Sequence, residues 1–311
     1  MSRLVTMLMS MAVLSTAGLV ASRADEAAPA ATAEQGSRNL LLRIVAAMVL
    51  APAALAIAYA GGWLWAALVT LASIGLYVEW LMIVGVARER RVVAAGGVAL
   101  AISGLCLASG RIDASLLVLA FGCAAVAWLS QERRLWTAAG FLYASGAEVA
   151  SVLVRLDQVW GFVALILILL VVWVTDIGGY FAGRGIGGPK LWPRVSPKKT
   201  WAGAVGGFAA SLAVAAGFVV IGFAEVEPPQ VLELGPVLLL GASLSIISQL
   251  GDLFESAVKR RFGVKDSSQL IPGHGGLLDR LDGFVAAVIM AAIFGLLRGG
   301  VDGVGRGLMV W

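Results

Sequence analysis

Charged side chains are scarce in this chain. Only 14% of its 311 residues are charged, 60% are hydrophobic, and the mean hydropathy is +0.92. Soluble domains carry roughly 25% charged residues, so this balance excludes an ordinary soluble protein. Apolar runs long enough to cross a hydrocarbon core recur along the chain. The sequence therefore predicts an all-α, polytopic membrane protein that forms one helical bundle, because no polar stretch is long enough for a soluble domain.

Residues that bind transition metals or form disulfides are also few. Two cysteines, Cys106 and Cys123, fall inside apolar runs, where a free thiol behaves as a small hydrophobic group. Neither has a CxxC partner or a neighbouring histidine, and His274 is the only histidine. We therefore expect neither a disulfide framework nor a zinc site.

The apolar runs predict about nine transmembrane helices. They lie near 44–60, 63–86, 92–109, 114–130, 135–153, 159–176, 203–223, 235–252 and 283–297. Alternate connections are basic, and these contain Arg38 and Arg43, then Arg88, Arg90 and Arg91, then Arg133 and Arg134, then the 184–199 and 259–280 loops. The intervening connections are short or acidic. The positive-inside rule thus places both long basic loops in the cytoplasm and the C-terminal tail outside.

Residues 1–36 form an N-terminal extension, and we expect the membrane domain to occupy 37–311. Arg3 precedes an apolar run over 4–20 and then a stretch of small residues, as in a targeting segment. If this run spanned the membrane and stayed attached, Arg38 would lie outside, and every later loop would lie on the opposite side of the membrane from the one predicted above. We expect instead that the extension is cleaved, lies on the surface or reflects an upstream start codon.

The first polar loop covers 175–201. Its three prolines and many glycines predict an ordered, non-helical excursion. Lys198 and Lys199 stand just before a helix expected near Trp201, where cations and free N–H groups can bind phosphate. Alternatively, this lysine pair only fixes topology or contacts anionic lipid headgroups. Asp176, at the end of an apolar span, is either functional or simply reaches water.

The second polar region begins inside a predicted span. Asp252, Ser256 and Lys259 are spaced i, i+4, i+7, so one helix face presents an acid, a hydroxyl and a base. Ser243 and Ser245, earlier in the same helix, fit an interhelical hydrogen-bond seam. That explanation fits Asp252 poorly, because an unpaired carboxylate at this depth is costly.

Further acids follow that helix. Asp279 and Asp282 share a face of the next helix, and together with Asp252 they can bind Mg²⁺ with phosphate oxygens and water. His274 can donate a hydrogen bond to phosphate or stabilise a turn. Arg280 can clamp a phosphate or act as the counter-ion of its flanking aspartates. Charge this dense beside a bilayer indicates a polyanionic ligand with metal ions, and hence phosphate chemistry at a membrane.

At these residues the chain resembles the phosphatidate cytidylyltransferase (CDP-diacylglycerol synthase) family. The family signature, S-x-x-K-R-x4-K-D followed by P-G-H-G-G-x-x-D-R-x-D, is matched by Ser256, Lys259, Arg260, Lys265, Asp266, Pro272 to Gly276, Asp279, Arg280 and Asp282. The upstream pattern D-x-G-A-Y-F, then S-P-K-K-T-W-E-G, is matched over 176–181 and 196–203. There, Gly179 replaces an alanine and Ala202 replaces a glutamate, which leaves any role of that glutamate in doubt.

The resemblance implies transfer of the cytidylyl group of CTP to phosphatidic acid, giving CDP-diacylglycerol and pyrophosphate in phospholipid biosynthesis, with magnesium. It implies metal binding by Asp252, Asp279 and Asp282, and catalytic roles for these three with Lys259 and Asp266. Substrate phosphates would be bound by Lys198, Lys199, Ser256, Arg260, Lys265, His274 and Arg280. We expect a multi-pass protein of the cell inner membrane with cytoplasmic active-site loops, membrane lipid as a partner and no nucleic acid. A homodimer is left open.

Three other activities were weighed against this one. A CTP-dependent polyprenol or dolichol kinase would phosphorylate an alcohol and would need a group that accepts the hydroxyl proton. A CDP-alcohol phosphotransferase is disfavoured because its D-G-x2-A-R…G-x3-D-x3-D pattern is absent. A transporter with a charged midplane site would show inverted repeats and broken helices in both halves, whereas the polar motifs crowd into the C-terminal half.

Overall fold

The computed structural model describes residues 48–221, 232–268 and 275–311. Within this part of the chain, eight helices are long and apolar enough to cross a membrane. They are α3 (Gly62–Ile83), α4 (Arg90–Ala108), α5 (Ile112–Leu129), α6 (Arg134–Leu156), α7 (Gly161–Gly185), α8 (Trp201–Ile221), α9 (Leu234–Arg261) and α10 (Leu278–Gly299). The prediction of an all-α polytopic membrane protein is confirmed.

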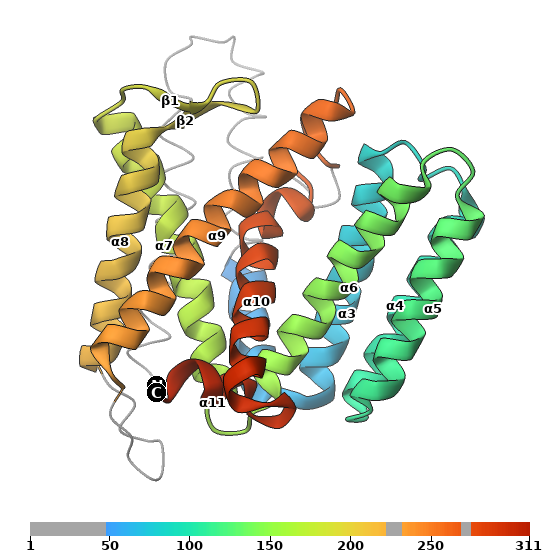
Figure 1. Ribbon diagram of the computed structural model, residues 1–311, viewed down its shortest axis with the longest axis horizontal. Helices are drawn as coiled ribbons and strands as arrows, with labels where there is room; N and C mark the ends of the chain where they lie inside the picture. Colours follow the sequence, from blue (N-terminus) through green and yellow to red (C-terminus); the bar gives the residue numbers. More distant parts are fainter. Residues whose placement is uncertain (1–47, 222–231, 269–274) are drawn as a thin grey trace.

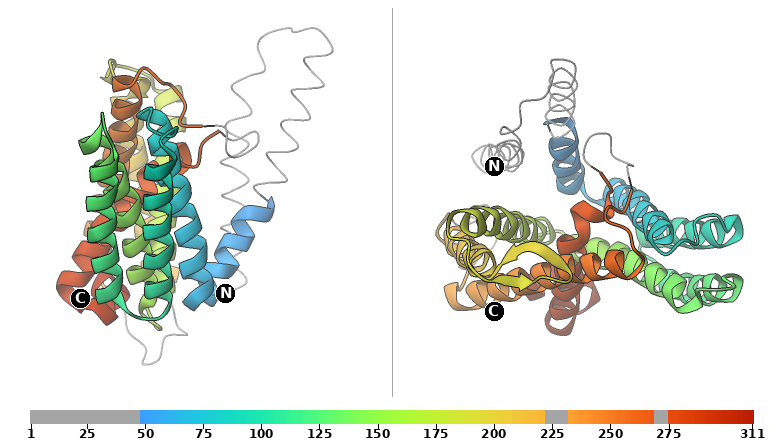
Figure 2. Two further views of the ribbon diagram at one scale, coloured as in Figure 1. Left: turned by 90° about the vertical axis from the view of Figure 1, so that its right-hand side faces the viewer. Right: turned by 90° about the horizontal axis from the view of Figure 1, so that it is seen from above.

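The remaining predicted span, 44–60, falls partly on a shorter apolar helix, Met48–Ala60, and partly outside the described residues. In Figure 2 this helix is inclined to the main bundle. The N-terminal extension, 1–36, also lies outside the described residues.

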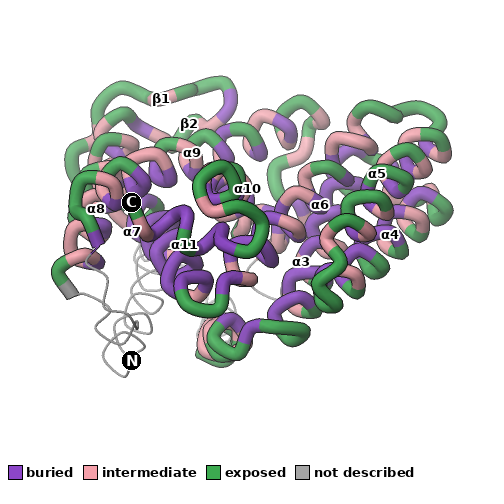
Figure 3. Tube along the Cα trace, turned by 60° about the horizontal axis from the view of Figure 1, so that its bottom comes forward, coloured by how far each residue is buried: buried purple, intermediate pink, exposed green. Residues whose placement is uncertain are grey.

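The helices form one bundle of three groups (Figure 1). Helices α7, α8 and α9 pack together on one side, α10 lies between them and the α3–α6 pair, and α4 and α5 form a hairpin at the far edge. The core centres on α7, whose residues Leu165 to Ile168 are fully buried. Helices α4 and α5 carry exposed large apolar side chains, among them Leu105, Phe121 and Trp128, as expected for surfaces that face lipid. Figure 3 marks exposed residues along both helices.

Helices α7 and α8 approach closely because small residues line their contact. A Cβ added to Gly207 would lie 2.4 Å from the Thr175 carbonyl oxygen, and one added to Gly206 would lie 2.2 Å from the Ala182 Cβ. Small residues allow backbones to meet in this way in membranes. The predicted non-helical excursion from 175 was therefore wrong in its first part, because α7 continues to Gly185 and its glycines serve helix packing rather than turns.

A two-stranded hairpin follows α7 and covers one end of the bundle (Figure 2). Strand β1 (Lys190–Trp192) pairs antiparallel with β2 (Ser196–Thr200), with Lys190 opposite Thr200 and Trp192 opposite Ser196. The register shifts between these pairs, at the residues that include Lys198 and Lys199. The start of α8 at Trp201 agrees with the sequence, and the Thr200 hydroxyl caps it by accepting a 3.1 Å hydrogen bond from the Gly203 N–H.

The charged ends of α9 and α10 are helical. Helix α9 runs nine residues past its predicted end at 252, and α10 begins five residues before its predicted start at 283. The helical segments therefore include Asp252, Ser256 and Lys259 on α9, with Asp279 and Asp282 on α10. After α10, a 3₁₀ turn (η2, Val301–Gly303) and α11 (Val304–Met309) pack back against α10, α7 and α6.

Candidate active site

Three aspartates from three helices face one another near the hairpin. Asp176 on α7 and Asp282 on α10 both lie close enough to Asp252 on α9 for their charges to repel. We call these three residues the aspartate cluster. Lys199 on β2 forms an ion pair with Asp252 Oδ2, and Ser256 donates a 3.4 Å hydrogen bond to Asp252 Oδ1. The hairpin thus places a cation beside a concentration of negative charge.

A second set of charges lies between α9 and α10. The Lys259 ammonium group is 2.7 Å from Glu255 Oε2 and 2.5 Å from Asp279 Oδ1. The other oxygen of Asp279, Oδ2, accepts a 3.1 Å hydrogen bond from the Ser267 N–H. Both carboxylate oxygens of Asp279 are therefore engaged by protein donors, and Lys259 holds the two helices together at this end.

Glu79 on α3 is part of this region, although no sequence motif pointed to it. Its side chain is 1% exposed, and it accepts hydrogen bonds from the backbone N–H groups of Leu277 and Leu278 at 2.8 and 2.7 Å. It also contacts the hydroxyls of Ser267 and Ser268 at 2.9 and 2.6 Å. The available signal was a lone carboxylate within an apolar span, which is costly unless it is paired.

The other predicted site residues are placed differently. Arg260 is exposed and its Nε donates a 3.4 Å hydrogen bond to the Val195 carbonyl, which ties α9 to the hairpin. Lys198, Lys265 and Asp266 are also exposed. Among the described contacts, these three take no part in the two sets of charges. His274, with Pro272 and Gly273, lies outside the described residues.

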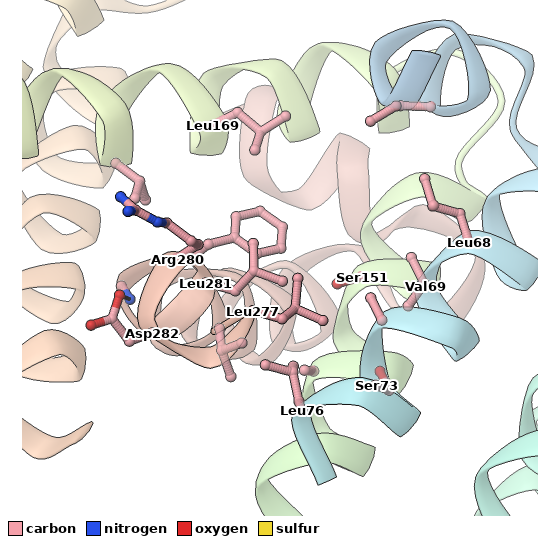
Figure 4. A pocket seen from close by; sticks show the side chains of 18 of the residues that line it. Leu68, Val69, Ser73, Leu76, Ser151, Leu169, Leu277, Arg280, Leu281 and Asp282 are labelled. Carbon is pink, nitrogen blue, oxygen red and sulfur yellow. Dashed lines mark hydrogen bonds between the residues drawn. The ribbon is translucent and has the colours of Figure 1, made fainter. Parts of the chain in front are cut away.

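A cavity of about 310 Å³ adjoins the aspartate cluster. Apolar residues of the Met48–Ala60 helix, α3, α6, α7 and α10 form most of its wall, and Asp176, Arg280 and Asp282 also line it. Figure 4 shows Arg280 and Asp282 on one side of the cavity, opposite Leu68 and Val69. The cavity is therefore apolar over most of its wall and charged at one end.

The predicted metal ligands are not assembled as a ready metal site. Within the described residues, no group of three or more His, Cys, Asp or Glu is arranged to hold a metal ion. Asp279 would first have to give up Lys259 or Ser267. The aspartate cluster offers the oxygen ligands that Mg²⁺ prefers, and its charges repel one another, but its three carboxylates would have to move closer together to hold an ion.

A family model and a known protein match this chain over most of its length, and other known proteins match a shorter part. The model of the cytidylyltransferase family matches residues 41–297. A phosphatidate cytidylyltransferase of Brucella suis is 42% identical over 265 residues, which cover 83% of this chain and 94% of that protein. Proteins of the same name are 44% identical in Haemophilus influenzae, over 44% of this chain and 47% of that protein, and in Bacillus subtilis, over 42% and 46%. The chain belongs to the cytidylyltransferase family.

Proposed function

We propose that this protein is a phosphatidate cytidylyltransferase, which transfers the cytidylyl group of CTP to phosphatidic acid and releases pyrophosphate. The observation that carries the proposal is the cavity beside the aspartate cluster. Its apolar wall suits an acyl chain within the membrane, and its charged end suits a phosphate headgroup. A nucleotide and a phospholipid can therefore meet where the bundle ends and the hairpin begins.

The reaction requires two polyanions to approach each other. The phosphate oxygen of phosphatidic acid is already an ionised nucleophile near neutral pH, so the attack on the α-phosphorus needs no general base. It does need positive charge that offsets the repulsion and stabilises the leaving pyrophosphate. In this proposal Lys199, beside the aspartate cluster, and Arg280, which lines the cavity, would supply that charge. Exposed Lys198, Arg260 and Lys265 would bind the outer phosphates of CTP.

Magnesium is part of the proposal. The aspartate cluster would hold the ion, with Asp252 and Asp282 as predicted from the sequence and Asp176 as the added ligand. Bound Mg²⁺ would polarise the phosphoryl oxygens and neutralise charge on the leaving group. Lys199 would then lie beside both the nucleotide and the ion's ligand Asp252. Asp279, tied to Lys259, would fix the position of α10 instead.

The orientation in the membrane follows from the basic connections. The α3–α4 and α5–α6 connections, with Arg88 and Arg133, lie at the same end of the bundle as the hairpin (Figure 1). Basic connections favour the cytoplasmic side, so the active site would face the cytoplasm from the inner membrane. The homodimer stays a prediction, which light scattering of detergent-solubilised protein checks.

The test is incorporation of labelled cytidine into lipid. Purified protein in mixed micelles is incubated with CTP labelled in the cytosine ring, Mg²⁺ and either phosphatidic acid or a polyprenol. We expect labelled CDP-diacylglycerol and stoichiometric pyrophosphate, and loss of both products in excess EDTA.

Two results would overturn parts of the proposal. Phosphorylated polyprenol without cytidine incorporation would assign a CTP-dependent kinase instead. Full turnover in excess EDTA would leave the cytidylyltransferase intact but remove the metal from the mechanism.

A further inference from the structure

The carboxylate of Glu79 is fully used by donors from a distant part of the chain. Oε1 accepts from the Leu277 N–H and the Ser268 hydroxyl, and Oε2 accepts from the Leu278 N–H and lies 2.9 Å from the Ser267 hydroxyl. These donors stand about 190 residues further along the chain, at the start of α10 and in the segment after α9. A glutamate on α3 therefore caps α10, whose first N–H groups find no local side-chain cap.

Packing around this carboxylate leaves no spare room. A Cβ added to Gly276 would lie 1.7 Å from Ser267 Oγ and 2.8 Å from Glu79 Oε2. Gly276 itself is buried. The second glycine of the G-G pair in the signature is thus required by the close packing of Ser267 and Glu79, independently of any ligand.

The contact continues to the charged residues of the site. The Ser267 hydroxyl lies 2.9 Å from Glu79 and 3.0 Å from Asp279 Oδ2. Asp279 pairs with Lys259, which pairs with Glu255. One hydrogen-bonded chain thus links α3, the start of α10 and the end of α9, and Asp282 follows Asp279 by one turn of α10.

We propose that Glu79 is a positioning residue for cytidylyl transfer: it fixes the start of α10, and thereby the place of Asp282 in the aspartate cluster. The inference rests on the proposed function. It also has a consequence for the substrate. Because Glu79 occupies the N–H groups of Leu277 and Leu278, the start of α10 does not serve as a phosphate site, although a free helix start would attract an anion.

Glu79→Gln tests the inference, because the amide keeps the shape but loses one acceptor oxygen and the charge. Glu148→Gln is the matched control. Glu148 is equally buried, on α6, and its carboxylate accepts from Thr70 and Ser103 at 2.8 and 3.0 Å, without lining the cavity or belonging to the aspartate cluster. We expect Glu79→Gln to lower kcat by about 10–100-fold, because small displacements of reacting groups have effects of this size. KM for CTP and for phosphatidic acid should change by less than about twofold, because the buried Glu79 carboxylate is already occupied by protein donors and is not proposed to bind either substrate.

A second readout does not depend on activity. Trypsin cleavage after exposed Lys265, in the segment that Glu79 holds through Ser267 and Ser268, should accelerate by about tenfold in Glu79→Gln and stay unchanged in Glu148→Gln. If Glu79→Gln does not fold, Ser267→Ala takes its place, because it removes the hydroxyl shared by Glu79 and Asp279. A smaller kcat loss with unchanged KM is then expected.

Wild-type kcat in Glu79→Gln, or in Ser267→Ala where that variant replaces it, would overturn the inference. The inference would also be overturned if Glu148→Gln had the same melting temperature as Glu79→Gln and lost as much kcat. The kcat loss of Glu79→Gln would then follow from lower stability alone. A wild-type protein that makes no CDP-diacylglycerol would refute the proposed function instead, and the cleavage rates would still report whether Glu79 holds the segment.

Discussion

At the scale of single residues, four of the described acids differ in what surrounds their carboxylates. Glu79 and Glu148 have both oxygens occupied by protein donors, so their burial is compensated. Asp252 and Asp282 instead face other carboxylates, with Lys199 as the cation that contacts Asp252. Repulsion of this sort persists in a native state where a ligand offsets it, and perturbed groups of this kind gather at functional sites.

Asp282→Asn is the most direct test of the aspartate cluster. It removes one negative charge and one carboxylate oxygen of the proposed metal site while nearly keeping the side-chain volume. We expect kcat to fall by about 100–1,000-fold, which is typical for loss of one electrostatic contact in a transition state. Asp302→Asn is the control, because Asp302 is an exposed acid in η2, beyond the far end of α10. Labelled-CTP turnover of the two membrane-inserted variants measures the difference, and near-normal turnover in Asp282→Asn would remove this residue from the metal site.

The adjacent lysines of the hairpin provide a second matched pair. Lys199 is half-buried and pairs with Asp252, whereas Lys198 is exposed. Lys199→Ala should lower kcat/KM for CTP by at least about tenfold, because charge-assisted contacts of this kind contribute roughly 1.5–3 kcal/mol. Lys198→Ala should have a smaller effect, mainly on KM. The effect of Lys198→Ala should also shrink at high ionic strength, because salt screens an exposed charge. Equal effects of both variants would mean that the lysines act only as surface charge.

Sequence reasoning could identify the residues that lie within one motif but not those that come from elsewhere. The i, i+4, i+7 spacing of Asp252, Ser256 and Lys259 survives because local helix geometry sets it. Glu79 escaped notice because its donors come from the opposite end of the chain, and only tertiary packing brings them together. A lone acid in an apolar span indicates that a partner exists, but the sequence does not show which residue the partner is.

At the scale of helices and strands, the glycines of 178–183 were the main source of error. Glycine clusters predict turns in water-soluble chains, because glycine there relaxes the backbone. In the membrane the same residues allow two helices to touch, and α7 stays helical while α8 packs along it. Helix α7 ends only at Gly185, just before Gly187 and Gly188, whose φ angles of 69° and 92° lie outside the helical region.

Gly207→Ala tests the α7–α8 contact. The added methyl group would meet the Thr175 carbonyl oxygen at 2.4 Å, a backbone atom that cannot move alone. Overpacking of this type costs about 1–3 kcal/mol, so the melting temperature in detergent should fall by several degrees. Gly217→Ala, on the same helix with open space around its Cα, should be neutral or slightly stabilising. Similar melting temperatures of both variants would contradict the close approach of α7 and α8.

At the scale of the whole bundle, the candidate active-site residues lie at one end only. The hairpin, the charged end of α9 and the start of α10 gather at one end, and the α4–α5 connection and α11 lie at the other (Figure 1). The basic connections share the end with the hairpin, so the alternation of charge along the sequence was sufficient to group them. It could not reveal that Asp176, Asp252 and Asp282 meet there, because their approach depends on how three helices pack.

Labelling of single cysteines checks which end faces the cytoplasm. In a background with Cys106 and Cys123 replaced by serine, Ser109→Cys places a thiol in the α4–α5 connection and Glu132→Cys places one in the α5–α6 connection. Both positions are exposed and lie at opposite ends of α5. An impermeant maleimide should label Ser109→Cys in intact cells, and Glu132→Cys only after permeabilisation, because the positive-inside rule predicts that the connection with Arg133 and Arg134 lies inside. The reverse pattern would put the aspartate cluster outside, where CTP is absent, and would rule out cytidylyl transfer by this site in the cell.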